Sequence, residues 1–379
     1  MNNNLTTIGI FGAVNSGKST LFNKLINQDL AIVSDIPGTT TDSVIKLIEL
    51  GELGRVKLID TAGIGDNSLL GDRRLKGTLE VAKTVDVAII VKAKNDTYSE
   101  QITLTLKKYN TPYLTVINKG IAMDNICSDN ALVIDYDSKN DIQVLIQELL
   151  KIKQSYSENL SITGSLAKAG DTVVLVMPQD KSAPDGRLIL PQSQTIKELL
   201  DKNCVAICVT PDKLKMVLDN MKEPPNLVIT DSSVYDVVWE ILPKYIKLSS
   251  FSVLFAKLKG DIDVFMEGSK ALDKLHCGSK VLIAEACSHT PKNEDIGSVK
   301  LPRLIKQVYG EGVIIDIVNG LELPNNLKEY DVIIHCGACM FSRKTVMNRI
   351  IEARLMGVPI TNYGIAIAKL NGILNKIVY

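Results

Sequence analysis

The chain has 379 residues, which is enough for about two or three domains that each bury a core of their own. Basic and acidic side chains balance at 43 each, and this neutrality argues against nucleic acid as a partner. The sequence shows neither a membrane-length apolar run nor the pattern of a secretory signal, so we expect a cytoplasmic protein with no membrane partner. In that reducing compartment the seven cysteines are expected to be metal ligands or buried thiols rather than disulfides.

Short apolar strands alternate with amphipathic helices in the first part of the chain. Strands are expected at residues 6–12, 55–63, 85–93 and 112–120, and helices at 18–27 and 141–156. Such apolar runs are typical of a parallel sheet that is buried on both faces. We therefore predict a first α/β domain over residues 1–165, ending in a polar, glycine-containing stretch.

The alternation of strands and helices restarts twice, which predicts two smaller α/β domains with parallel sheets at residues 166–260 and 261–379. In the second domain strands are expected at 171–179, 186–192, 204–210 and 226–231, and helices at 194–203, 211–221, 234–242 and 244–260. In the third, strands are expected at 280–287, 312–320 and 330–337, and a helix from Ser342 to a stop at Gly357. The second domain contains no catalytic constellation, which leaves a spacer or an oligomerisation role.

The stretch GAVNSGKS at residues 12–19 fits the phosphate-binding pattern G-x-x-x-x-G-K-[ST], between a predicted strand and a predicted helix. Its glycines would let backbone N–H groups surround the phosphates, while the lysine reaches the β- and γ-phosphates and the serine hydroxyl binds Mg²⁺. The residues expected to contact the nucleotide here are Gly12, Asn15, Ser16, Gly17, Lys18, Ser19 and Thr20.

Further segments fit the same kind of site. The stretch DTAG ends a predicted strand and would place Asp60 on Mg²⁺ through water and the Gly63 N–H near the γ-phosphate. Residues 37–42, PGTTTD, lie before it, where a switch loop would lie. Asn118 and Lys119 end another strand, at the place expected for recognition of the base.

These segments together resemble the Era/TrmE-like branch of the translation-factor class of GTPases. The resemblance implies a GTP-hydrolysing P-loop domain whose catalytic residues are Lys18, Thr40 and Gly63, with Thr40 sensing Mg²⁺. It also implies that Asn15 is a K⁺ ligand, although an asparagine at this position could equally cap the loop.

Two positions depart from that family. Ile121 stands where the family has the aspartate that selects guanine, and the next aspartate is Asp124. Ile64 follows the DTAG stretch, and an isoleucine cannot orient the attacking water. We therefore expect slow GTP hydrolysis that K⁺ or a partner stimulates, which suits a switch.

The third domain carries two segments rich in metal-binding side chains, CSH at residues 287–289 and HCGAC at 335–339. Each follows a predicted strand, so both would lie at one sheet edge if the strands are parallel neighbours. Gly337 would relieve the backbone of the tight C-x-x-C turn. Three cysteines with one histidine fit a structural zinc site, and three cysteines fit a 4Fe-4S cluster with an open fourth position. From the residues alone, both chemistries and the absence of a metal remain open.

The order of these motifs, together with stretches such as PQDKSAPDGRLILPQ and VIIHCGACM, resembles the HydF family of FeFe-hydrogenase maturation GTPases along essentially the whole chain. The resemblance implies a GTPase domain, a dimerisation domain and an iron–sulfur domain, in that order. It implies a 4Fe-4S cluster on Cys287, Cys336 and Cys339. The candidates for the labile fourth position are His289, His335 and Glu294.

The function that this resemblance implies is a scaffold and carrier that hydrolyses GTP and delivers a diiron precursor to the hydrogenase. The implied partners are FeFe-hydrogenase and radical-SAM maturases, and the implied assembly is a homodimer or tetramer. The alternatives are an Era/TrmE-like GTPase that acts on RNA and has a structural zinc site, and an interaction module with a degenerate nucleotide site. The neutral charge argues against the first alternative, and the intact Lys18, Ser19 and Asp60 argue against the second.

Overall fold

The computed structural model describes residues 5–27, 34–35, 43–63, 69–93, 98–120, 131–156, 161–178, 188–286, 296–320, 323–338 and 342–379. The chain forms two compact units, Met1–Asn159 and Leu160–Tyr379. Both are built from helices and largely parallel sheets, which confirms the predicted α/β class. The residue ranges of the three predicted domains stay predictions. Within the described part of the chain, none of the helices has the length and apolar character that crossing a bilayer requires.

The first unit contains a sheet with the strand order β2-β3-β4-β1-β5-β6-β7 among the residues described. Its elements are β1 (Thr6–Phe11), α1 (Lys18–Ile26), β2 (Ser34–Asp35), β3 (Val44–Glu49), β4 (Arg55–Asp60), α2 (Leu69–Thr84), β5 (Val87–Val91), α3 (Tyr98–Lys108), β6 (Tyr113–Asn118), β7 (Ala131–Ile134) and α4 (Lys139–Tyr156). Strand β3 runs antiparallel to both neighbours, and the strands from β4 to β7 are parallel. The carboxyl ends of β1, β4, β5 and β6 therefore share one edge.

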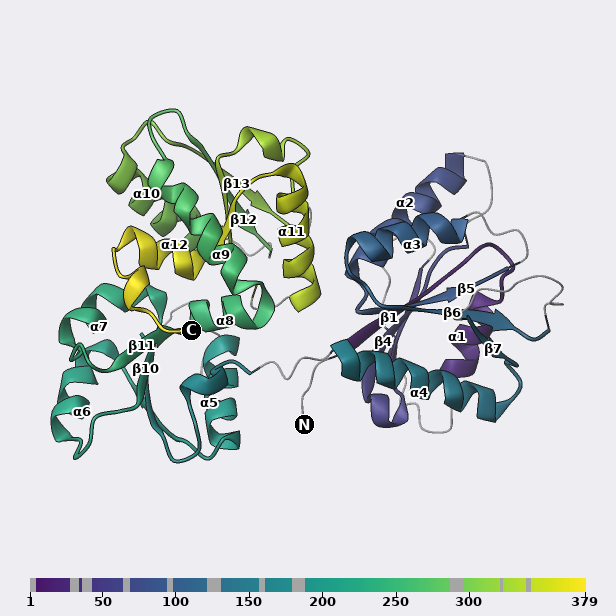
Figure 1. Ribbon diagram of the computed structural model, residues 1–379, viewed down its shortest axis with the longest axis horizontal. Coiled ribbons are helices and arrows are strands. Elements are labelled where there is room, and N and C mark those ends of the chain that lie inside the picture. The colour runs from purple at the N-terminus through teal and green to yellow at the C-terminus, as the bar shows by residue number, and fades with distance from the viewer. Residues whose placement is uncertain are drawn as a thin grey trace. The chain divides into compact units, whose positions relative to one another are not determined.

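Helices cover both faces of this sheet (Figure 1). Apolar side chains of α1 and α4, such as Leu21 and Leu145, pack with Ile10 on one face. Side chains of α2 and α3, such as Ala82 and Ile102, belong to a second core on the other face. Because both faces are covered, β5 is apolar along its whole length and the strands β1, β4 and β6 contain runs of buried apolar residues, which is the pattern that made them recognisable in the sequence.

The second unit contains two sheets, and the first of them has the order β11-β10-β8-β9. Its elements are β8 (Thr172–Val176), α5 (Leu190–Asp201), β9 (Val205–Val209), α6 (Leu214–Asn220), β10 (Leu227–Thr230), α7 (Tyr235–Ile241), β11 (Lys247–Ser250) and α8 (Phe251–Lys259). All neighbouring strands in it are parallel.

Two of the predicted elements in this part are wrong. The strand expected at 186–192 is not formed by its described residues, because α5 begins at Leu190 with Pro191 in its first turn, where proline is favoured. The helix expected at 244–260 is a strand followed by a helix. Its first half pairs with β10, and the Ser250 hydroxyl caps α8 by accepting a hydrogen bond from Val253 N at 3.1 Å.

The other sheet of the second unit has the order β13-β12-β14-β15, and its strands are all parallel. Its elements are α9 (Ile262–Ser269), β12 (Lys280–Glu285), α10 (Leu301–Tyr309), β13 (Ile314–Asn319), β14 (Val332–His335), α11 (Arg343–Met356), β15 (Ile360–Asn362) and α12 (Tyr363–Leu370). The expected ends of α11 are confirmed, because Ser342 caps its start and Gly357 ends it in the left-handed conformation with φ +73°.

Helix α8 and the C-terminal residues join the two sheets of the second unit. Val253 and Ala256 of α8 belong to the core of one sheet, while Leu254 belongs to the core of the other. Val378 N donates a hydrogen bond to Leu248 O at 2.9 Å, so the end of the chain lies along β11. Shared packing of this kind explains why the two sheets form one compact unit.

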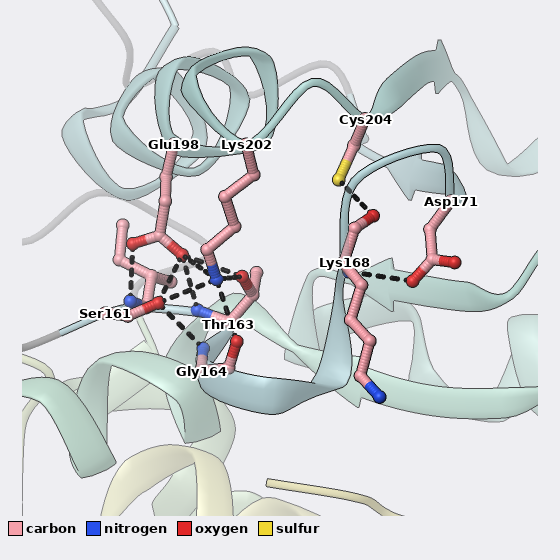
Figure 2. A network of polar contacts seen from close by, with 9 residues as sticks. Ser161, Thr163, Gly164, Lys168, Asp171, Glu198, Lys202 and Cys204 are labelled. Atoms are coloured by element: carbon pink, nitrogen blue, oxygen red, sulfur yellow. Dashed lines mark hydrogen bonds and ion pairs between the residues drawn. The ribbon is translucent and has the colours of Figure 1, made fainter.

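A single carboxylate fastens the start of the second unit to helix α5 (Figure 2). The Glu198 carboxylate accepts hydrogen bonds from Ser161 Oγ, Ile162 N, Thr163 N and Thr163 Oγ1, at 2.6 to 2.9 Å. Lys202, one helical turn later, donates to Ser161 Oγ, Thr163 Oγ1 and Gly164 O at 2.7 to 2.8 Å. The incoming segment is therefore held by charged groups at both its N–H and its oxygen atoms.

The helix α9 lies so close to β15 that only glycine fits at the contact. A Cβ on Gly268 would lie 2.0 Å from Ile360 O. We expect Gly268→Ala to lower the free energy of unfolding of this unit by about 2–3 kcal/mol, because the clash with backbone exceeds alanine's helix preference of about 1 kcal/mol. Urea unfolding followed by the fluorescence of Trp239, the chain's single tryptophan and part of α7, measures it.

Gly337→Ala is the matched control for this prediction. A Cβ on Gly337 meets nothing within 4 Å, and its φ is not in the left-handed region. The free energy of unfolding should therefore change by less than about 0.5 kcal/mol. Equal effects of the two substitutions would contradict the close-packing argument.

Candidate functional site

The loop from residue 12 to 17, between β1 and α1, has a backbone that requires small or flexible residues. The φ angles of Gly12, Asn15 and Gly17 are +151°, +61° and +96°. A Cβ on Gly12 would lie 2.4 Å from Val91 O, so no larger residue fits there. Asparagine is among the few residues that tolerate a positive φ, which explains Asn15 structurally. Its predicted role as a K⁺ ligand stays a prediction.

Three of the predicted nucleotide-site residues come together beside this loop. The Lys18 side chain is 5% exposed, and its Nζ donates a hydrogen bond to Ala13 O at 2.7 Å. A Cβ on Gly63 would lie 3.2 Å from that Nζ. Asp60 ends β4 in register with Ile10 of β1, so the carboxylate emerges at the same sheet edge as the loop.

The charge of Asp60 depends on its neighbours. Burial raises the pKa of this carboxyl, while a hydrogen bond with the Ser19 side chain and the nearby Lys18 charge lower it. A Mg²⁺ ion would stabilise the charged carboxylate in the same way as the lysine does. Ser19 and Asp60 are thus placed together, as expected for residues that share one hydrated Mg²⁺. Thr20 follows on α1 and is exposed.

Buried polar atoms without a hydrogen-bond partner gather around this loop in the described part of the chain. They include Ser16 Oγ, Asp60 Oδ1 and the Tyr136 hydroxyl. Ser16 Oγ lies 2.8 Å from the place of a Cβ on Gly12, and the Tyr136 ring lies 3.1 Å from that of a Cβ on Gly17. Buried polar groups are normally satisfied. The residues therefore fit a nucleotide phosphate with Mg²⁺, whose oxygens and charge would engage these atoms.

The expected base-recognition residues lie at the end of β6, on the same sheet edge. Asn118 Oδ1 accepts a hydrogen bond from Gly120 N at 3.0 Å. Lys119 Nζ forms an ion pair with Asp141 Oδ2 at 2.7 Å, and the hydrogen bond from Lys119 is the main cause of the lowered pKa of Asp141. Asp141 belongs to the first turn of α4 and not to a motif, so nothing in the sequence singles it out.

Several predicted features of the nucleotide site lie outside the described residues. They are Thr40 with the rest of the PGTTTD stretch, Ile64, Ile121 and Asp124. The roles assigned to Thr40 and to the two isoleucines remain predictions.

The second candidate site lies at the carboxyl edge of the sheet β13-β12-β14-β15. Strands β12 and β14 are parallel neighbours, with Ala284 opposite His335, as the metal-site prediction required. Cys336 follows β14 and is 8% exposed, and its Sγ accepts a hydrogen bond from Ala286 N at 3.1 Å. Ala286 directly precedes Cys287 in the sequence, so the end of β12 and the Cys336 turn lie together at this edge.

His335, a predicted candidate for the fourth ligand, is fully buried and has hydrogen-bond partners at both ring nitrogens. Nδ1 lies 2.6 Å from Cys336 O, and Nε2 lies 3.0 Å from Arg349 Nη1. Burial, and then the Arg349 charge, lower the pKa of His335 to about 3, so the ring is neutral. In this arrangement neither nitrogen has a lone pair available for a metal.

The backbone of the HCGAC turn differs from the expectation. Gly337 was expected to relieve the turn, but the residue in the left-handed region is Ala338, with φ +45°. Lys259 at the end of α8 donates a hydrogen bond to Ala338 O at 2.8 Å and so holds the strained residue in place. The left-handed residue of this turn is therefore an alanine whose carbonyl contacts α8, and not the glycine.

The remaining candidate ligands Cys287, His289, Glu294 and Cys339 lie outside the described residues. Within the described ranges, no group of three or more His, Cys, Asp or Glu side chains is arranged to hold a metal ion. Of the three proposed cysteine ligands, Cys336 belongs to the described ranges, and the Ala286 N–H lies beside its sulfur. A buried cysteine with a backbone donor at its sulfur fits a cluster thiolate, because such hydrogen bonds tune iron–sulfur centres.

The residues that hold the Cys336 turn were missed by the sequence analysis. Arg349 and Asn362 contact His335 and Cys336 O, and Lys259 contacts Ala338 O. One signal was available. Arg349 lies three residues after Val346 and four before Ala353 on a helix, so a charged residue occupies the apolar stripe that is buried in the structure.

The fold and the loop geometry of the first unit define a P-loop GTPase domain, and residues 7–119 match the family model described as 50S ribosome-binding GTPase. Two further models cover the second unit. Residues 162–260 match the hydrogen maturase F dimerization domain, and residues 263–379 match the hydrogen maturase F tetramerization domain. The chain belongs to the hydrogen maturase F family. These domains also indicate that the chain assembles into oligomers.

Individual relatives resemble part of the chain. The tRNA modification GTPase MnmE of Aliarcobacter butzleri is 32% identical over 41% of this chain and 36% of its own length. The GTPase Der of a Nitratiruptor species is 36% identical over 30% of this chain and 25% of its own. Among solved structures, the G domain of the T. maritima FeoB iron transporter is 18% identical over 39% of this chain and 98% of its own, with a TM-score of 0.29. The chain thus spans about a third or less of the length of these two curated relatives.

Proposed function

We propose that this chain is a GTP-hydrolysing scaffold and carrier in the cytoplasm, which binds a 4Fe-4S cluster and a diiron precursor and delivers the precursor to FeFe-hydrogenase. The observation that carries the proposal is the edge of β12 and β14, where Cys336 Sγ lies 3.1 Å from the N–H of the residue before Cys287. Membership of the hydrogen maturase F family supports the same reading. Radical-SAM maturases are the proposed source of the precursor.

Cys287, Cys336 and Cys339 are the proposed cluster ligands, and the cluster would supply an iron with an exchangeable position. The chain's own part is to hold the thiolates at one sheet edge. The Ala286 N–H stabilises the negative charge on Cys336 Sγ. With His335 engaged at both ring nitrogens, His289, Glu294 or an exogenous group remains for the fourth position.

The GTPase domain is proposed to control exchange of the precursor or of partners, and not to take part in the iron chemistry. Lys18 would neutralise the β- and γ-phosphates, and Ser19 and Asp60 would hold Mg²⁺. Because Ile64 and Ile121 replace catalytic and specificity residues, hydrolysis would be slow and stimulated by K⁺ at Asn15 or by a partner. Control requires that the nucleotide bind the two assembly states with different affinities.

Anaerobic reconstitution of the full chain with ferrous iron and sulfide tests the proposal. The wild-type chain should bind about four irons, and its reduced form should give a 4Fe-4S EPR signal that changes when imidazole or cyanide is added. Cys336→Ser should lose most of this iron, because a thiolate ligand is removed. Metal analysis together with EPR gives both results.

Cys208→Ser is the matched control, because Cys208 is an exposed thiol of β9 in the same unit and is not a proposed ligand. It should keep the wild-type iron content. Stoichiometric zinc that iron cannot displace would contradict the cluster proposal and favour the RNA-acting GTPase with a structural zinc site.

A further inference from the structure

A buried arginine lies behind the Cys336 turn. Arg349 of α11 is only 1% exposed. Its Nη1 donates to His335 Nε2 at 3.0 Å, and its Nη2 donates to Gly320 O. Taking a guanidinium out of water is costly unless its N–H groups are hydrogen-bonded and its charge is used. The packing of an amphipathic helix alone therefore does not explain why a guanidinium is buried at this position.

The hydrogen bonds around His335 allow one assignment of its protons. A guanidinium has donors and no acceptor, so His335 Nε2 must accept from Arg349. A carbonyl oxygen only accepts, so His335 Nδ1 must carry the proton that it donates to Cys336 O. Arg349 thus fixes one neutral tautomer, and this tautomer in turn fixes the carbonyl of Cys336.

This contact belongs to a network of hydrogen bonds across the carboxyl edge of the sheet. Gly320 follows β13, His335 ends β14 and Asn362 ends β15. Asn362 Nδ2 donates to the same Cys336 O at 3.3 Å. Among the residues named in this hydrogen-bond network, Arg349 is the member that belongs to a helix. Its side chain therefore couples the position of α11 to the backbone that carries Cys336.

The guanidinium is also within electrostatic reach of the cysteine. Its Nη1 contacts the ring of His335, and the other nitrogen of that ring contacts Cys336 O. The positive charge of Arg349 is therefore held one side chain behind the cysteine, where it would stabilise negative charge on the sulfur. In a cluster with cysteine ligands, reduction adds a further negative charge, and a fixed positive charge nearby favours the reduced form.

We propose that Arg349 is a positioning residue of the metal site, which locks His335 in its Nδ1–H tautomer, excludes His335 from the metal ligands and places a positive charge behind Cys336. The inference deepens the proposed function and rests on it for the effect on the cluster. The effect on His335 is a property of the metal-free chain and stands without a cluster.

The reduction potential of the reconstituted cluster tests the electrostatic part. Arg349→Gln should shift the potential to a more negative value, because the reduced cluster loses its neighbouring positive charge. Arg349→Lys retains the charge and should restore most of the shift. Arg354→Gln removes an arginine from the exposed side of the same helix, where its side chain is 62% exposed, and should leave the potential unchanged. An unchanged potential in Arg349→Gln would overturn this part of the proposal.

Nitrogen NMR of the metal-free chain tests the tautomer independently. The chain has three histidines, so a ¹⁵N-histidine-labelled sample gives few signals, and loss of one signal in His335→Gln assigns it. His335 should show a protonated Nδ1 and an unprotonated Nε2. Arg349→Gln should abolish this preference for the Nδ1–H tautomer. A protonated Nε2 in the wild-type chain would refute the inference.

The two tests separate the possible failures. If the wild-type chain binds no cluster but shows the Nδ1–H tautomer, the proposed function fails and the positioning role of Arg349 survives. If His335→Gln folds, binds iron and loses a directly coordinated nitrogen that the wild-type EPR spectrum shows, His335 is a ligand and the inference is wrong.

Discussion

Lys18→Ala is expected to reduce GTP turnover by about 10²–10³-fold or more and to leave iron binding unchanged. Lys18 is buried beside the loop that would hold the phosphates, and its Nζ donates to Ala13 O at 2.7 Å. Gly63, the residue expected near the γ-phosphate, lies against the same Nζ. Removing this charge takes away the stabilisation of the phosphates in the transition state, where it matters most. Phosphate release under saturating GTP and Mg²⁺ measures the loss.

Lys24→Ala is the control on the same helix. Lys24 forms an ion pair with Asp137 at 2.6 Å, with side chains that are 40% and 84% exposed, so water screens the pair and its removal should change neither turnover nor stability noticeably. Iron content after reconstitution is measured in parallel for both variants. If Lys18→Ala keeps its far-ultraviolet circular dichroism but loses its iron, the nucleotide and metal sites do not have the separate roles proposed here.

The parts of the fold that the sequence predicted well are those in which a local pattern determines the outcome. The strands that lead to Asp60, Asn118 and His335 end in buried apolar residues, so their apolar runs identify them without knowledge of their partners. The two ends of α11 follow from Ser342 and Gly357, whose side-chain oxygen and missing Cβ act within one helical turn.

The wrong predictions of secondary structure arise where contacts between residues distant in sequence determine the local structure. The run from 244 to 260 has helix-compatible composition, but its first part pairs with β10 and so becomes a strand. The fourth-ligand role of His335 stays a prediction, which comes from the sequence because Cys336 and Cys339 follow this histidine closely. In the structure a side chain of the next helix, that of Arg349, occupies its second nitrogen. A local motif identifies residues that can bind a metal, but not those already engaged by the core.

Glu198→Ala is expected to lower the free energy of unfolding of the second unit by about 3 kcal/mol at neutral pH, since hydrogen bonds to a charged group contribute about 1.5–3 kcal/mol each and are not additive. Its side chain is 19% exposed, and the donors of Ile162 and Thr163 would lose their acceptor (Figure 2). Glu198→Gln retains one acceptor oxygen and should lose about half as much. Asp201→Asn is the control on the same helix, because its ion pair with Lys197 is exposed.

The same carboxylate should make stability depend on pH in a defined direction. Burial alone would raise the pKa of Glu198, but its hydrogen bonds from Thr163, Ile162 and Ser161 outweigh burial, and the pKa lies below its usual value of 4.5. A group with a lowered pKa stabilises the folded state fully above the pKa of the unfolded state, and this contribution is lost as the pH falls through the folded pKa. The stability gap between wild type and Glu198→Gln should therefore be largest near neutrality and shrink below about pH 4.5.

Trp239 makes this measurement specific, because the chain's single tryptophan belongs to the unit that Glu198 fastens. Urea unfolding is followed by its fluorescence at several pH values for the wild type, Glu198→Gln and Asp201→Asn. A gap that stays constant or widens as the pH falls would show that Glu198 acts through packing and not through its charge. A gap that closes with acid shows that the negative charge itself holds the segment at Ser161 and Thr163, the point at which the chain enters the second unit.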